Sequence, residues 1–368
     1  MQATWEVADV LRAVPDFGSV LNMGVHQSKT LRALQHCRTA ALGGHVDACD
    51  ACGVLKISYN SCRNRHCPKC QGHKRVEWIA QRQQDLLPVT YFHVVFTLPQ
   101  ELNPLTLHAP AIVYNALFKA AWKTLQYFTA AQLVQSGMIA LLHTWGQNLS
   151  LHPHLHCIVP GGGVCGQGRF KKLKHEKNFL FSVRAMGKVF RAKYVEELRG
   201  AGITDQVLFD KLFQKDWVVY AKRPFGGPKN VIAYLGRYTH KVAISNHRIV
   251  EVTASEVTLT YKDYKDNGKQ KTMCLSNAEF IRRFAQHILP HRFVRIRHYG
   301  ILSSSWKRGR LRALQVQLQV KPKEKPVKTL LHSCPHCKTG TMITIELFGK
   351  RGPPPEYLTG VQSQTCQP

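Results

Sequence analysis

The sequence predicts an α+β fold in which a central antiparallel sheet is flanked by helices and preceded by a small cysteine-rich domain. Short apolar segments between residues 91 and 160 are typical of buried strands. Residues 110–134 carry apolar side chains at helical spacing, so this segment is expected to pack on the sheet. Six cysteines fall within residues 37–70, a density that indicates a metal-stabilised unit.

Each element of the sheet-containing part follows from its local pattern. Strands are expected at residues 91–99 and 138–144, and a turn after Trp145 leads into a third strand that carries three histidines. Further helices are expected at residues 73–87, 184–198 and 276–287, the last capped by Ser276 or Asn277. A strand beginning at Trp217 is expected to return to the sheet, and residues 241–250, 251–261 and 269–275 are expected to form a meander with a hairpin turn at 266–268.

The charge balance indicates a polyanionic partner. The chain of 368 residues has 51 Lys and Arg against 22 Asp and Glu, a net charge of +29 spread along its whole length. A membrane surface is the competing partner, but no apolar run approaches the roughly 18 residues of a spanning helix, and no signal-peptide pattern opens the chain. Nucleic acid is therefore the expected partner, no membrane association is expected, and the expected location is the cytoplasm.

The cysteines are expected to bind zinc rather than to form disulfides, because they occur in Cys-x-x-Cys pairs in a chain without a leader pattern. The two pairs Cys49/Cys52 and Cys67/Cys70 predict one tetrahedral zinc site. The residues left over nearby have the right chemistry for a second zinc: Cys37, His45, Cys62 and His66. Near the C-terminus, Cys334 and Cys337 form half of a further knuckle whose second half is not visible in the sequence.

The segment between the two zinc knuckles is both basic and aromatic. Tyr59, Arg63, Arg65 and Lys69 are expected to form a DNA-contacting surface in which cations hold phosphates and the tyrosine stacks. Docking of another protein on the same surface is the alternative. The chain is thus divided into a helical start and zinc-binding, DNA-contacting domain (1–85), a sheet-containing domain (86–305), and a basic linker and tail (306–368).

Two motifs in the second domain carry the candidate chemistry. A strand period of two puts His154 and His156 on one face, where two imidazoles form a platform for a divalent metal. About eighty residues later, Tyr234 and Tyr238 would lie one turn apart on one face if their segment is helical. A solvated strand and a packed tyrosine pair are the ordinary alternatives for either motif taken alone.

Together the cysteine-rich module, the histidine pair and the tyrosine pair, in this order over residues 25–305, resemble the rolling-circle insertion-sequence transposases of the two-tyrosine HUH type with an N-terminal zinc-binding domain. The resemblance implies an HUH endonuclease core that cleaves and rejoins single-stranded DNA through 5′-phosphotyrosine links to Tyr234 and Tyr238. It also implies catalytic Mg²⁺ or Mn²⁺ beside structural Zn²⁺, and Arg237 and Lys241 would hold phosphate.

The third ligand of the catalytic metal is less defined. In the family that the chain resembles it is a Glu, Gln or His upstream of the pair, and Gln147 matches best, with His143, His152 and His93 as alternatives.

The same resemblance implies as substrates single-stranded DNA at the element ends and at the target, in the nucleoid of a prokaryote. Because no Walker motif is present, unwinding is expected to come from a host helicase or replication machinery. Two other functions remain open: a plasmid replication initiator or relaxase with the same chemistry, and a zinc-dependent DNA-binding protein without catalysis.

Overall fold

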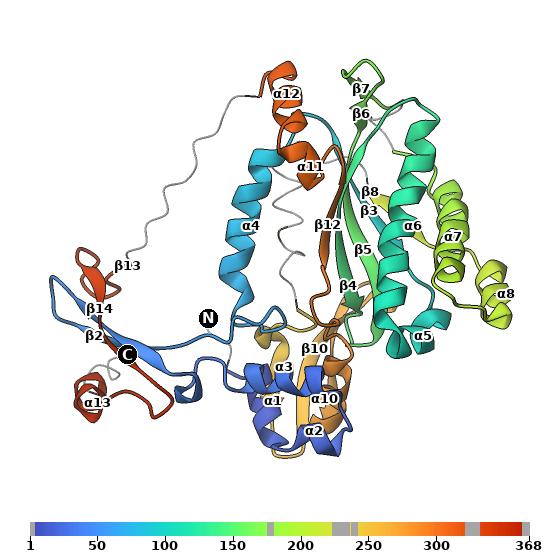
Figure 1. Cartoon of the computed structure of the whole chain (residues 1–368). Coiled ribbons are helices and arrows are strands. Elements are labelled where there is room, and N and C mark those ends of the chain that lie inside the picture. Colours follow the sequence, from blue (N-terminus) through green and yellow to red (C-terminus); the bar gives the residue numbers. More distant parts are fainter. Residues whose placement is uncertain (1–3, 175–179, 223–235, 237–241, 321–331, 363–368) are drawn as a thin grey trace.

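The structure is a computed structural model that describes residues 4–174, 180–222, 236, 242–320 and 332–362 (Figure 1). A five-stranded antiparallel sheet lies at its centre, in the order β12-β4-β5-β3-β8. Its strands are β3 (Tyr91–Thr97), β4 (Gly137–Trp145), β5 (Leu151–Pro160), β8 (Val219–Lys222) and β12 (Ile296–Gly300). The predicted α+β fold with a central antiparallel sheet is confirmed, including the antiparallel pairing of β4 with the histidine strand β5.

The alternation along these strands divides the sheet into two different faces. On β3, Phe92, Val94 and Phe96 belong to one core, which also contains residues of α6 (Pro110–Ala130) and α7 (Val183–Gly200). Tyr91 and His93 lie on the opposite face of β3. Tyr91 belongs to a second core with residues of α4 (Gln71–Asp85) and α12 (Arg310–Gln317). Helices therefore cover the sheet from both sides (Figure 1).

The local signals for the helices agree with the structure. Pro110 stands in the first turn of α6, where its missing N–H would have no helical partner. The Ser182 and Ser276 side chains cap α7 and α10 (Asn277–Ala285) by accepting the N–H groups of Ala185 and Glu279. The predicted helices at 73–87, 110–134, 184–198 and 276–287 are thus observed with shifts of a few residues at their ends.

A separate core joins the N-terminal helices to the meander. It contains apolar residues of α1 (Val7–Ala13), α3 (Val25–Gln35), β9 (Ile249–Val252), β10 (Glu256–Asp263) and α10. The strands pair in the order β11-β10-β9, with β11 at Lys269–Ser276. The first predicted strand of the meander, 241–250, is placed too early, because Asn246–Arg248 form a 3-10 turn (η3) and pairing starts only at Ile249.

The third unit is a four-stranded sheet made from both ends of the chain, in the order β13-β14-β1-β2. Its strands are β1 (Gly44–Cys49), β2 (Leu55–Tyr59), β13 (His332–Ser333) and β14 (Thr341–Phe348). Figure 1 shows this sheet set apart from the central one. The domain boundaries at 85/86 and 305/306 stay a prediction, but packing and strand pairing cross both of them.

The remaining elements are short or peripheral: α2 (Phe17–Val20), η1 (Ala40–Leu42), η2 (Gln100–Leu102), α5 (Asn103–His108), β6 (Gly162–Val164), β7 (Phe170–Lys172), α8 (Gln206–Gln214), η4 (Tyr264–Asp266), α11 (Ser304–Lys307) and α13 (Pro355–Gln362). Among the described residues, no helix is both long and apolar enough to cross a membrane.

Phe96 tests the assignment of the two sheet faces. Its ring is fully buried against Phe190 of α7, with ring centroids 4.9 Å apart. We expect Phe96→Ala to lower the free energy of unfolding by about 3–5 kcal/mol, since a large cavity opens between β3 and α7. Val207→Ala on α8, where Val207 is 65% exposed, should change it by less than about 0.5 kcal/mol. Urea unfolding followed by circular dichroism measures both, and equal effects would contradict this packing.

Candidate functional site

Three histidines from two adjacent strands meet on the α4 side of the central sheet. His143 of β4 lies directly opposite His154 of β5, and His156 follows two residues along β5 on the same face. One ring nitrogen from each lies within 4.8 Å of the others. The alternation predicted from the sequence thus holds for His154 and His156, and the pairing of β4 with β5 adds His143 to them.

Contacts on the far side of two of these rings select the nitrogen that can bind a metal. Nδ1 of His154 lies 2.7 Å from the carbonyl oxygen of His152. A carbonyl can only accept, so the neutral His154 ring carries its proton on Nδ1 and donates it to this oxygen. Nδ1 of His156 lies 2.9 Å from Nε2 of the buried His93 on β3. Both contacts are made through Nδ1, so Nε2 is the nitrogen that we expect to bind a metal, as in histidine ligands oriented by an outer partner.

Burial keeps the His154 ring in the form that binds metals. The pKa of His154 is lowered from its ordinary value to about 4, chiefly because burial disfavours the charged ring. The ring is therefore neutral at pH 7, and a neutral imidazole nitrogen is a good ligand for Zn²⁺, Mn²⁺ and similar cations.

The turn between β4 and β5 is held by the neighbouring core. The buried His287, which follows α10, bonds through Nδ1 to Thr144 Oγ1 and donates from Nε2 to the Leu149 carbonyl, both at 3.1 Å. Arg248 and Arg283 donate to the carbonyls of residues 147 and 148 in the same turn. Contacts from η3, α10 and His287 thus fix the end of the hairpin that carries the histidines, and Leu149 in the turn belongs to the core shared by the N-terminal helices and the meander.

Among the candidates for the third ligand, the structure brings His143 to the pair. Gln147 lies in the turn beyond the end of β4, where its carbonyl accepts from Arg248. His152 is exposed, and its ring is tilted by 47° to that of His154, with centroids 5.2 Å apart. His93 of β3 contacts His156 through Nδ1 of the His156 ring. Sequence alone favoured Gln147 over His143 because it does not give the strand register, and that register places His143 opposite His154.

Tyr234, Tyr238, Arg237 and Lys241 lie outside the described residues. Gly236, between the two tyrosines, is described and buried, and a β-carbon there would collide with the Ile79 side chain of α4. Ile79 packs against the core on the histidine side of the sheet. The backbone at Gly236 is thus in contact with the helix that covers this face.

The first cysteine cluster comprises Cys37, Cys62, Cys67 and Cys70. Sulfur–sulfur distances of 3.5–3.6 Å join Cys37 to Cys67, Cys37 to Cys70 and Cys62 to Cys70. Four thiolates about 2.3 Å from one zinc would be about 3.8 Å apart, so the cluster fits a tetrahedral ion. Hydrogen bonding to Cys37 raises the pKa of the Cys62 thiol to about 12, so without a cation the four sulfurs resist full ionisation.

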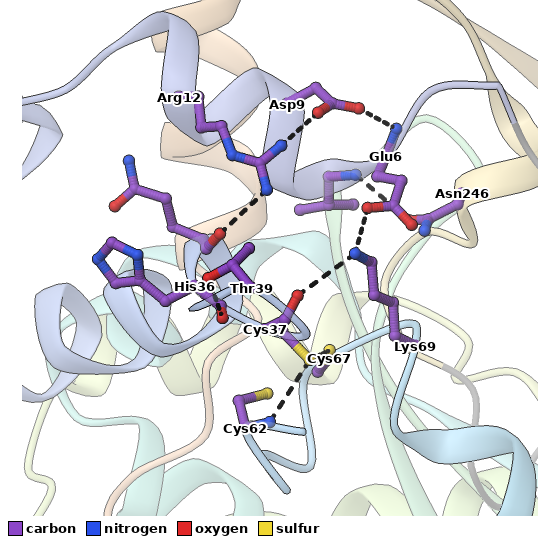
Figure 2. Close-up of polar contacts among 12 residues, drawn as sticks. Glu6, Asp9, Arg12, His36, Cys37, Thr39, Cys62, Cys67, Lys69 and Asn246 are labelled. Atoms are coloured by element: carbon purple, nitrogen blue, oxygen red, sulfur yellow. Dashed lines mark hydrogen bonds and ion pairs between the residues drawn. The ribbon is translucent and has the colours of Figure 1, made fainter. Parts of the chain in front are cut away.

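This cluster is part of the core that joins the N-terminal helices to the meander. Figure 2 shows Cys37 and Cys67 beside Lys69, whose amine donates to the Cys37 carbonyl and pairs with Glu6. In the same region Asn246 accepts the backbone N–H of Val7 at 3.3 Å (Figure 2). An ion bound there would link Cys37, just after α3, to Cys62, Cys67 and Cys70, which lie between β2 and α4.

The second cluster comprises Cys49, Cys52, Cys334 and Cys337. It lies in the four-stranded sheet that the two ends of the chain share.

The predicted grouping of the zinc ligands is therefore corrected. Cys49/Cys52 and Cys67/Cys70 do not share a site, because the strands β1 and β2 carry the first pair away from the second. Two predicted ligands also lie elsewhere: His45 pairs with Asp47 at 3.3 Å, and Nε2 of the buried His66 accepts from the Leu289 N–H at 3.4 Å. Sequence spacing missed the C-terminal partner because the two pairs lie far apart along the chain.

The predicted DNA-contacting residues fall into two groups. Arg65 donates to the carbonyls of Pro290 and Phe293, and Lys69 bonds to Cys37 and Glu6, so both are engaged inside the protein. Arg63 is exposed, and so is Tyr59, whose ring contacts Phe348 edge-on at 5.9 Å. Their binding to DNA stays a prediction.

These features define a class of protein: a basic α+β protein with cysteine clusters suited to zinc and a cluster of three histidines on its sheet. Comparison with known proteins is consistent with this class. Residues 137–309 match a family model described as "Putative transposase", and residues 10–98 match a model described as a transposase zinc-binding domain.

Two relatives are informative. "Putative transposase y4qJ" of Sinorhizobium fredii is 40% identical over 387 aligned residues, covering 95% of this chain and 97% of the relative. The transposase for insertion sequence element IS801 of Pseudomonas savastanoi pv. phaseolicola is 29% identical over 292 residues, covering 75% of this chain and 70% of that protein. No solved structure matches the chain significantly. The chain belongs to the two-tyrosine insertion-sequence transposases with an N-terminal zinc-binding domain.

His93 tests the histidine centre, because it is expected to position His156 without binding the ion. We expect His93→Phe to weaken Mn²⁺ binding about 10–100-fold, since Nδ1 of His156 loses its partner, whereas His93→Gln should keep much of the affinity. Electron paramagnetic resonance of free Mn²⁺ measures the Kd in zinc-loaded protein, where thiolate clusters do not compete for this harder ion. His298→Phe on β12, on the same sheet face, is the matched control. Wild-type affinity in His93→Phe would disprove the positioning role.

Proposed function

We propose that this transposase cleaves and rejoins single-stranded DNA by a rolling-circle mechanism, with Tyr234 and Tyr238 as nucleophiles and a divalent ion at His143, His154 and His156. The observation that carries the proposal is the convergence of three imidazoles on one sheet face in a chain of this family. Contact of Gly236, between the tyrosines, with α4 on that same side supports it further.

The histidine centre suits the electrostatic part of the reaction. When bound, Mg²⁺ or Mn²⁺ would withdraw charge from a non-bridging phosphate oxygen and so ease attack at phosphorus. The protein holds the three rings ready for the ion, because β4 and β5 set their spacing while His152 and His93 orient His154 and His156. Since the rings are already in place, little reorganisation would accompany metal binding.

The tyrosines supply the covalent chemistry. A tyrosine with an ordinary pKa near 10 is protonated at pH 7, and forming its phenolate costs about 4 kcal/mol. Attack of that oxygen on phosphorus forms the 5′-phosphotyrosine bond and breaks the bond to the 3′-oxygen, which leaves as a hydroxyl after taking up a proton. Attack by a different 3′-hydroxyl reverses the step and joins two strands, so no external energy source is needed.

A second tyrosine allows a second cleavage while the first link persists. Arg237 and Lys241, next to the tyrosines in sequence, are proposed to hold phosphates, and Tyr59 and Arg63 to contact the strand on the zinc-binding side. The excess of positive charge, +29 for the chain, would favour such contacts throughout. A host helicase or replication machinery is proposed to provide the single strand.

A covalent-adduct assay tests the proposal. Purified protein is incubated with end-labelled single-stranded oligonucleotides from the ends of its element and Mn²⁺ or Mg²⁺, then denatured and separated by electrophoresis. We expect a labelled protein band that disappears in the double variant Tyr234→Phe/Tyr238→Phe, because both nucleophilic oxygens are gone. The band should also fall below detection in His143→Ala, because the ion loses a ligand.

Tyr264→Phe is the matched control, since Tyr264 is 72% exposed on η4, and it should form the adduct normally. Fluorescence anisotropy should show that the double tyrosine variant still binds the oligonucleotide. An adduct that persists in the double variant would disprove the assignment of the nucleophiles. A wild-type protein that binds DNA and holds zinc but forms no adduct would contradict the proposed reaction.

A further inference from the structure

The most informative feature outside the histidine centre is the second cysteine cluster, which combines residues from the two ends of the chain. The Sγ atoms of Cys49 and Cys337 are 3.7 Å apart, and so are those of Cys52 and Cys334. All four lie within 4.8 Å of one another, close to the spacing of about 3.8 Å expected around one tetrahedral zinc. The paired residues are separated by 288 and 282 positions in the sequence.

The backbone around the sulfurs has the form of two zinc knuckles facing each other. The N–H of Cys52 points to Cys49 Sγ at 3.5 Å, and the N–H of Gly340 points to Cys337 Sγ at 3.3 Å. Such N–H donors stabilise thiolate charge. Gly340 fits closely against the N-terminal knuckle, because a β-carbon there would lie 2.5 Å from Cys49 Sγ and 2.7 Å from the Ala51 β-carbon.

Strand pairing aligns the two knuckles. β14 pairs antiparallel with β1 from Gly44 opposite Phe348 to Cys49 opposite Met342. Beyond the last pair, Asp50 and Thr341 exchange two hydrogen bonds, from the Asp50 N–H to the Thr341 carbonyl at 3.1 Å and from the Thr341 N–H to the Asp50 carboxylate at 2.7 Å. The pairing thus continues up to the cysteines.

The sheet itself has little apolar core to hold it together. The buried cluster around the sulfurs consists of Cys49, Cys334 and Met342, with Cys337 packed against them. On β14, Ile343 and Ile345 are about half exposed, at 49% and 48%, and Leu347 is 76% exposed. A sheet that buries so few side chains needs another source of stability, and structural zinc supplies one in domains of this size.

We propose that Cys49, Cys52, Cys334 and Cys337 bind a structural zinc ion that fastens the C-terminal strand β14 to the N-terminal sheet. The site is bipartite: neither knuckle can complete a four-thiolate shell alone. The ion closes a loop of 288 residues between Cys49 and Cys337, and a cross-link that closes a long loop removes more freedom from the unfolded state than one that closes a short loop. The zinc-binding lobe is consequently complete only when both ends of the chain are present.

Zinc counts in full-length variants test the shared site. Relative to wild type, Cys49→Ser/Cys52→Ser and Cys334→Ser/Cys337→Ser should each lose one zinc per chain by elemental mass spectrometry. The quadruple variant should also lose one and not two, because all four residues serve one ion. Cys165→Ser/Cys274→Ser, at cysteines outside both clusters, should lose none. An unchanged zinc content in Cys334→Ser/Cys337→Ser would overturn the proposal.

A second measurement uses the wild-type protein and does not depend on the folding of variants. Cys52 and Cys274 are both exposed, so a free thiol at either position should react with N-ethylmaleimide. If Cys52 holds zinc, native labelling followed by peptide mass spectrometry should modify Cys274 at least tenfold faster than Cys52 and Cys337, and removal of zinc with a chelator should abolish the difference. Equal labelling of Cys52 and Cys274 in zinc-loaded protein would overturn the proposal.

Discussion

The pairing of β4 with β5 is the constraint on which the site depends. Its register places His143 opposite His154 and turns all three imidazoles to one face, while Leu142, Leu155 and Cys157 face the large core under α6 and α7. A shift by one residue would exchange these two sets of side chains, so burial of the apolar set also fixes the histidines. The three histidines are thereby held by the same packing that stabilises the central sheet.

The two cysteine clusters lie outside the central sheet, and zinc bound there would stabilise these other parts of the chain. One cluster lies in the core shared by the N-terminal helices and the meander, and that core in turn holds the β4–β5 turn through His287. The other lies where the two chain ends meet. Zinc at the first cluster would stabilise the core that holds the β4–β5 turn. Zinc at the second cluster would stabilise the four-stranded sheet, which carries Tyr59 at the end of β2.

Much of this arrangement follows from local sequence patterns. The strands at residues 91–97 and 137–145, helix α6 and the shared face of His154 and His156 follow from periodicity, which short-range backbone geometry dictates. Contacts between segments distant in the chain could not be predicted from these local patterns. His143 required the strand register, and the grouping of Cys49 and Cys52 with Cys334 and Cys337 required the pairing of β1 with β14, which spacing within one knuckle does not encode. His45 and His66 are residue types that bind zinc, but they contact Asp47 and the Leu289 N–H and lie outside both cysteine clusters.

The most direct test of the histidine centre is a crystal structure of the zinc-loaded protein soaked with Mn²⁺, with anomalous data collected at the manganese edge. We expect one anomalous peak bonded to Nε2 of His154 and of His156, with an imidazole nitrogen of His143 as the third protein ligand. A manganese ion held by the Gln147 side chain in place of His143, or bound away from this face of the sheet, would contradict this expectation.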